Sequence, residues 1–150
     1  MNMFRYVMNP KPQKSVKVYG RALRISTKNS VKICREINGK PLKKAKRLLE
    51  DLITQKRSIN GKYYTNISRT LLKLLESAEK NAEFKGLELE KMIVKASSHK
   101  GFTFWRPRRL KLRGTKRKMT NIQIFLEEKY LVIILEEIKF LIWILIIVLI

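Results

Sequence analysis

The feature that most constrains this chain is a cationic stretch in its second half, from residue 95 to residue 118. Short β-type runs flank it at 92–94 and 122–126, so the pattern predicts two antiparallel strands joined by a long cationic connection. Such a hairpin has too much charge and too few apolar residues to bury itself against its own domain, and we expect it to protrude. Its partner must supply negative charge, for which phosphate is the commonest source. The stretch contains no Asp or Glu and ten basic residues: Lys95, Lys100, Arg106, Arg108, Arg109, Lys111, Arg113, Lys116, Arg117 and Lys118.

The charge of the whole chain also indicates a polyanionic partner. The 150 residues include 34 basic and 12 acidic side chains, a net charge of +22, and residues 129–150 contribute nothing to that net charge. A free globular protein with this imbalance is destabilised by self-repulsion, so we expect a polyanion to neutralise it in the working state. The single cysteine excludes an internal disulfide, and the apolar cluster at Met3–Phe4 is too short for a secretory signal. We therefore expect a cytoplasmic protein.

The residue types needed for catalysis or metal binding are scarce. His99 is the only histidine, Asp51 the only aspartate and Cys34 the only cysteine, whereas metal sites normally need three or four such ligands. No glycine-rich motif for cradling phosphate is present. We expect no enzymatic activity, metal or cofactor; a nuclease, the enzyme alternative, would need an acid–base or metal cluster that the sequence lacks. Cys34 lies at helix-core spacing and is expected to be a small buried hydrophobe.

Hydrophobic periodicity and terminal signals predict three helices, at 26–38, 41–53 and 66–85. Strand-like residues lie on both sides of Gly20, and the runs flanking the cationic stretch add a hairpin at about 91–126. The expected fold class is α+β, with three helices packed on a small antiparallel sheet and a long protruding β-hairpin. If the hairpin turns near Pro107, each arm has about twelve residues.

The two ends of the chain differ from this body in composition. Residues 1–15 are predicted to be a flexible basic lead, residues 16–128 one domain, and residues 129–150 an apolar tail. The tail is wholly apolar only from residue 140, which is short of the roughly twenty residues that a membrane span needs. A longer span would place Glu136, Glu137 and Lys139 near its centre. The free-energy cost of inserting these charges into the membrane nearly cancels the gain from inserting the apolar residues. A cationic membrane-associated protein anchored through 130–150 therefore remains the alternative function.

Several separated segments resemble one protein family: Arg24-Ile25-Ser26, residues 81–87, residues 96–101, residues 120–124 and Glu127-Glu128. With these segments the sequence is similar to the universal large-subunit ribosomal protein twenty-two family in its archaeal and eukaryotic form, over about residues 16–128. It departs from the family in a short loop at 58–64 between the second and third helices and in the residues after the Pro-Arg pair at 107–108. The apolar tail has no counterpart in the family.

This resemblance implies a structural constituent of the large ribosomal subunit that binds large-subunit rRNA and neighbouring ribosomal proteins. It further implies that the hairpin reaches toward the nascent-peptide exit tunnel and lines it, with the nascent peptide near the tip. By the same likeness the tip comprises Trp105, Arg106, Pro107, Arg108 and Arg109. The residues expected to bind rRNA are Arg21, Arg24, Lys28, His99, Lys100, Arg106, Arg108, Arg109, Lys111, Arg113, Lys116, Arg117 and Lys118.

The aromatic residues in the cationic stretch have two interpretations. Phe102, Phe104 and Trp105 could pack together and hold the two strands of the hairpin. Aromatic rings among cations can equally stack on unpaired bases. The sequence leaves both open, with Trp105 favoured as the contact to a base or to the tunnel.

Overall fold

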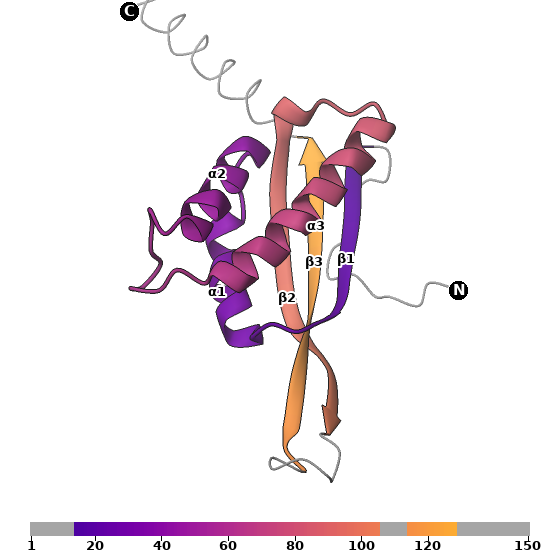
Figure 1. Cartoon of the computed structure of the whole chain (residues 1–150). Helices are drawn as coiled ribbons and strands as arrows, with labels where there is room; N and C mark the ends of the chain where they lie inside the picture. The colour runs from indigo at the N-terminus through magenta and orange to yellow at the C-terminus, as the bar shows by residue number, and fades with distance from the viewer. Residues whose placement is uncertain (1–13, 106–113, 129–150) are drawn as a thin grey trace, which may run out of the picture.

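The structure is a computed structural model that describes residues 14–105 and 114–128. Three antiparallel strands form one sheet in the order β1-β3-β2, and three α-helices accompany it (Figure 1). This arrangement confirms the predicted α+β class. The elements in chain order are β1 (Ser15–Leu23), α1 (Thr27–Ile37), α2 (Leu42–Ile53), α3 (Thr65–Phe84), the short 3-10 helix η2 (Leu89–Lys91), β2 (Met92–Trp105) and β3 (Lys116–Glu128).

The core forms where the apolar stripes of the helices meet one face of the sheet. Ile33 of α1, Leu49 of α2 and Leu71 of α3 are fully buried, as is Ile124 of β3. Along β3 the residues 122, 124 and 126 belong to this cluster, as the period of two in a strand requires. The predicted helices are confirmed to within a few residues, because their apolar periodicity is the pattern that the sheet buries.

The proximal half of the hairpin belongs to the body rather than to a free arm. Strand β1 pairs with β3 from Ser15↔Glu127 to Leu23↔Thr120, so only the part beyond Thr120 is a two-stranded ribbon that protrudes (Figure 1). Lys95 lies within the body part, and its ammonium is 2.6 Å from the carboxylate of Glu127. The expectation that the whole stretch 95–118 projects was therefore wrong for residues 95–100, since the buried Val94 and Ala96 pack this strand segment onto the core.

The register fixes where the described pairing of the hairpin ends. Trp105 is the last described paired residue of β2 and lies opposite Lys116. The turn predicted near Pro107 lies outside the described residues.

Some predicted features lie outside the described residues. They are the basic lead up to residue 13, the apolar tail 129–150, and the predicted contact residues Arg106, Pro107, Arg108, Arg109, Lys111 and Arg113. Among the described helices, none has the length and apolar character needed to cross a bilayer.

The only cysteine provides a test of the packed core. Cys34 is 3% exposed on the inner face of α1, and burial raises the pKa of its thiol from 9.0 to about 12. Because the thiolate is the reactive form, we expect thiol-alkylating reagents to leave the folded chain unmodified near neutral pH and to label it fully in denaturant. Labelling should accelerate as the pH approaches the raised pKa. Rapid labelling of the folded protein near neutral pH would contradict the burial of this side chain.

Candidate nucleic-acid interface

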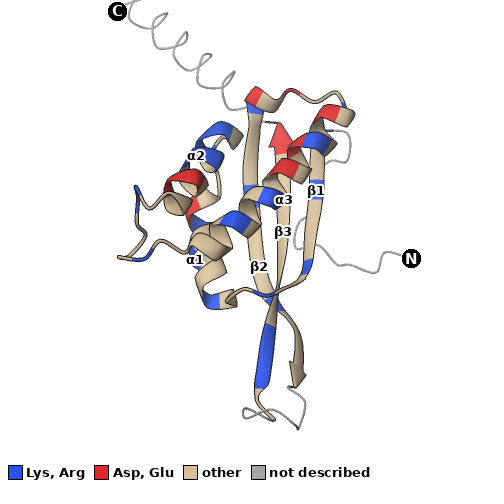
Figure 2. Ribbon diagram, in the orientation of Figure 1, with Lys and Arg blue, Asp and Glu red and all other residues tan. Residues whose placement is uncertain are grey.

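Acidic side chains are absent from the protruding part of the hairpin, whereas basic ones occur both there and on the helices (Figure 2). The described acidic residues lie on the helices, at or next to η2 and at the far end of β3. Five of these ten acidic side chains form ion pairs with lysines. The described ion pairs are Lys40–Glu36, Lys43–Glu90, Lys46–Glu79, Lys91–Glu88 and Lys95–Glu127.

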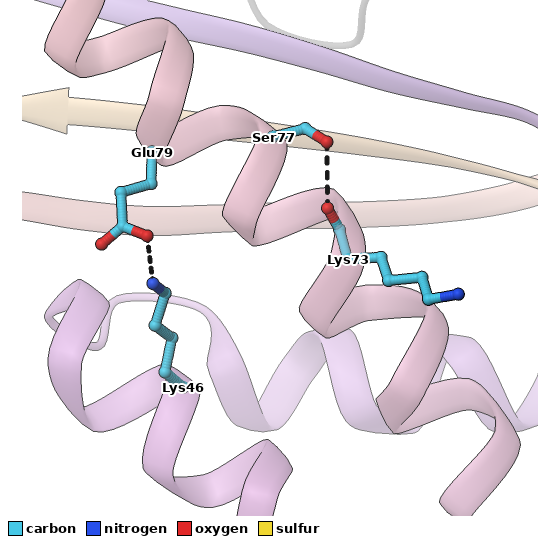
Figure 3. A network of polar contacts seen from close by, with 4 residues as sticks. All are labelled: Lys46, Lys73, Ser77 and Glu79. Atoms are coloured by element: carbon cyan, nitrogen blue, oxygen red, sulfur yellow. Dashed lines mark hydrogen bonds and ion pairs between the residues drawn. The ribbon is translucent and has the colours of Figure 1, made fainter.

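Two of these ion pairs join α2 to other elements of the body. Lys46 of α2 and Glu79 of α3 face each other across the helix interface (Figure 3), and their side chains are only about one quarter exposed. Lys73, on the same helix as Glu79, points its ammonium away from this pair, while its carbonyl accepts a hydrogen bond from Ser77 at 3.0 Å. About one turn earlier along α2, the hydrogen bond and charge of Lys43 lower the pKa of the Glu90 carboxyl. These two carboxylates therefore link α2 to α3 and to η2.

The basic residues at the hairpin end have no such partners. Arg24 and Lys28 are exposed at the connection from β1 to α1, and Lys100, Arg117 and Lys118 are exposed on the hairpin. No acidic side chain within residues 14–105 or 114–128 forms an ion pair with any of them. These cations share one end of the molecule with no internal compensation, which makes that end a surface for anions.

A cleft of about 830 Å³ lies between the β1–α1 connection and the arms of the hairpin. We name it the hairpin-base cleft. Its lining contains no acidic residue; the apolar part is formed by Ile25, Phe104 and Met119, and the basic part by Arg24, Lys28, Lys100, Lys116, Arg117 and Lys118.

Two threonines hold the walls of the cleft together. The hydroxyl of Thr120, on β3, donates to the carbonyl of Ile25 at 2.7 Å, and it lies 2.8 Å from the hydroxyl of Thr27. Because the Thr120 hydroxyl has one proton, Thr27 is the donor in the second bond. Thr120 is fully buried, so these bonds fix the start of α1 against the hairpin strand.

A second anchor, Asn121, stabilises the point where the hairpin leaves the body. Both outer strands are irregular here, β1 between Gly20 and Leu23 and β2 between Lys100 and Thr103. The Asn121 side-chain carbonyl accepts a 2.9 Å hydrogen bond from the backbone N–H of Ala22, which has a positive φ of 52°. Gly101 lies directly against the same side chain: a Cβ at this position would be 2.7 Å from Oδ1 of Asn121.

The predicted contact residues divide into three groups. Arg24, Lys28, Lys100, Lys116, Arg117 and Lys118 come together around the hairpin-base cleft. Arg21 and His99 are exposed but do not line it. The His99 ring lies 6.3 Å from the Tyr19 ring and 3.4 Å from the Asn121 amide nitrogen. The third group is the set at the connection, which is outside the described residues. Trp105, the described member of the predicted tip, is 64% exposed, with the ammonium of Lys116 at 5.4 Å from its ring centre.

The sequence predicted the basic residues of the cleft but not the uncharged residues that line it or join its walls. Thr27 and Thr120 are separated by 93 positions, and nothing in the local sequence pairs them. Ile25 and Met119 each lie next to a basic segment. This proximity is the only sequence signal that could have identified them as the apolar lining of the cleft. Within the described residues, no group of three or more His, Cys, Asp or Glu is placed to hold a metal ion.

The contact between Gly101 and Asn121 can be tested by a double-mutant cycle. We expect Gly101→Ala to push the Asn121 side chain away, because its new methyl group would overlap Oδ1. Loss of the hydrogen bond to Ala22 should cost about 0.5–1.5 kcal/mol of unfolding free energy. Amide exchange at Ala22, measured by NMR, should accelerate.

The control is Asn121→Ala, which removes the acceptor itself. In that background Gly101→Ala should add little, since its target is gone. Full additivity of the two substitutions would contradict the coupling.

Comparison with known proteins finds a matching family model and similar sequences. The family model described as ribosomal protein L22p/L17e matches residues 18–127. A protein of Methanococcus aeolicus named large ribosomal subunit protein uL22 is 35% identical over 153 residues, covering 87% of this chain and 100% of the relative. Proteins with the same name from Methanocaldococcus jannaschii and Thermofilum pendens are 33% and 34% identical; they cover 85% and 67% of this chain and are themselves covered to 97% and 79%.

Proposed function

The chain belongs to the ribosomal protein L22p/L17e family, and from this premise we propose that its hairpin end binds large-subunit rRNA. Membership makes it a structural, non-enzymatic component of the large ribosomal subunit, located on the ribosome in the cytoplasm. We further propose that the hairpin reaches toward the nascent-peptide exit tunnel and lines part of it.

The observation that carries the rRNA proposal is the set of uncompensated cations at the hairpin end. Bringing Arg24, Lys28 and Lys100 to one cleft concentrates positive charge that no described carboxylate offsets. RNA phosphates supply the compensating charge, and the counterions released from the RNA drive the association. Contacts to phosphate and to the shape of the RNA should dominate, because the deep groove of A-form RNA hides its base edges.

The mechanism that follows is electrostatic. The hairpin places its cations between RNA segments that would otherwise repel one another, and so fixes the relative positions of those segments. The body remains outside, since all the described acidic residues lie on it and weaken its attraction for RNA. Neighbouring ribosomal proteins are the proposed partners of that body.

The tunnel proposal rests on the shape of the hairpin and on the family. The two-stranded part points away from the helices (Figure 1), so its described end lies away from the core. Trp105, Arg106, Pro107, Arg108 and Arg109 are the residues proposed to line the tunnel near the nascent peptide. The family match ends at residue 127, and the apolar tail 129–150 has no role in this proposal.

Salt dependence tests the rRNA proposal. The affinity of the full chain for large-subunit rRNA should fall steeply with salt, with a log–log slope of about −0.7 to −0.9 per phosphate contact. Replacing Lys100, Arg117 and Lys118 together by Gln should flatten the slope by about 2 units, because three contacts are lost. The corresponding change at Arg106, Arg108 and Arg109 tests the connection in the same way.

The matched control removes three exposed cations from the helices. Lys44, Arg47 and Lys80 replaced by Gln change the net charge equally but lie away from the hairpin. This variant should keep the wild-type slope. Equal flattening by both triple variants would show a non-specific charge effect and would count against the hairpin end as the contact surface.

A further inference from the structure

The hairpin-base cleft has a mixed chemistry that phosphate binding alone does not require. Its basic residues are all exposed, whereas Ile25, Phe104 and Met119 are half-buried, so the apolar groups lie deeper than the charges. A site for the backbone of an RNA duplex needs only cations. An apolar interior beneath a cationic rim fits a ligand that is apolar and flat at one end and anionic at the other.

We propose that this cleft binds a single unpaired nucleotide of the RNA, with its base against the apolar residues and its phosphates on the rim. The inference rests on the proposed function, which makes RNA the partner. The volume of about 830 Å³ lies within the roughly 300–1,000 Å³ of pockets that enclose small ligands. An unpaired base is flat, weakly polar on its faces and joined to two phosphates, which matches this arrangement of the lining.

The strand register supplies the groups that would contact the base. Phe104 of β2 lies directly opposite Arg117 of β3, so their side chains emerge on the same face of the ribbon, and both line the cleft. An aromatic ring and a planar guanidinium are the two protein groups that stack on unpaired bases in RNA. A duplex presents no free base face to such a pair, because its bases are already stacked on one another.

The two walls of the cleft are already joined before any ligand binds. The hydrogen bonds from Thr27 to Thr120 and from Thr120 to the Ile25 carbonyl join its two walls through a buried side chain. A preformed site loses little conformational entropy on binding. The cleft can therefore select an extruded nucleotide rather than reshape itself around one.

The test compares single-stranded with double-stranded RNA. The full chain is titrated with single-stranded oligoadenylate of about eight nucleotides and with an RNA duplex of the same length. Phe104→Ala should weaken binding of the single strand roughly tenfold, because one stacked base is lost. The salt slope should not change, since the slope counts phosphate contacts, and affinity for the duplex should be unaltered.

Two variants separate stacking from folding and from non-specific aromatic effects. Phe104→Leu keeps an apolar side chain in the cleft but removes the flat ring, and should lose most of the same affinity. Phe102→Ala removes an aromatic residue that is 69% exposed on the same strand and does not line the cleft, so it should bind both RNAs as the wild type does.

Photocrosslinking locates the nucleotide. A single strand containing 4-thiouridine should crosslink to Phe104 or Met119, as mapped by mass spectrometry. Equal effects of the Phe102 and Phe104 variants, or crosslinks confined to other residues, would overturn the nucleotide site. A steep salt dependence with rRNA would then still support the proposed function, whereas a flat one would contradict both.

Discussion

Strand β3 pairs with both β1 and β2 over its second half and with β2 alone toward the connection. Its second half contributes Ile122, Ile124 and Leu126 to the core, and its first half begins with Lys116, Arg117 and Lys118. The single strand β3 therefore joins the body, which is stabilised by a buried apolar core, to the protruding cationic part of the hairpin, which has no such core. The positions of the described cations on the hairpin follow from this register.

The distribution of charge follows from the same division. Five of the ten described carboxylates pair with lysines, as in Lys46–Glu79 and Lys95–Glu127, and all ten lie away from the protruding part of the hairpin. The hairpin end has no carboxylate, so its self-repulsion is relieved only by an external anion. The family places the chain in the large ribosomal subunit, and under the proposed function rRNA phosphate supplies that anion. The segregation of charge lets one chain have a self-sufficient body and a hairpin that depends on its partner.

Much of the fold could be predicted from local patterns. The helices have a regular apolar stripe, which predicts their buried face. The hairpin is excluded from the core by its charge, except where apolar residues alternate with the basic ones. The same reasoning failed at Lys95, because Val94 and Ala96 beside it are buried and keep the strand in the sheet. The cleft was not predictable, because its walls are joined by Thr27 and Thr120, whose pairing depends on tertiary structure. Its charges could be predicted because they are clustered in sequence, but its shape could not.

Under the proposed function, RNA phosphate covers the cations of the hairpin end in the assembled subunit. Lysine acylation measures this directly, by comparing the modification rate of each lysine in the intact large subunit with its rate in the free protein. We expect Lys28, Lys100, Lys116 and Lys118 to be strongly protected in the subunit, and Lys44 and Lys80 on the helices to be protected much less. Equal modification rates for the hairpin-end lysines in the two states would contradict the account.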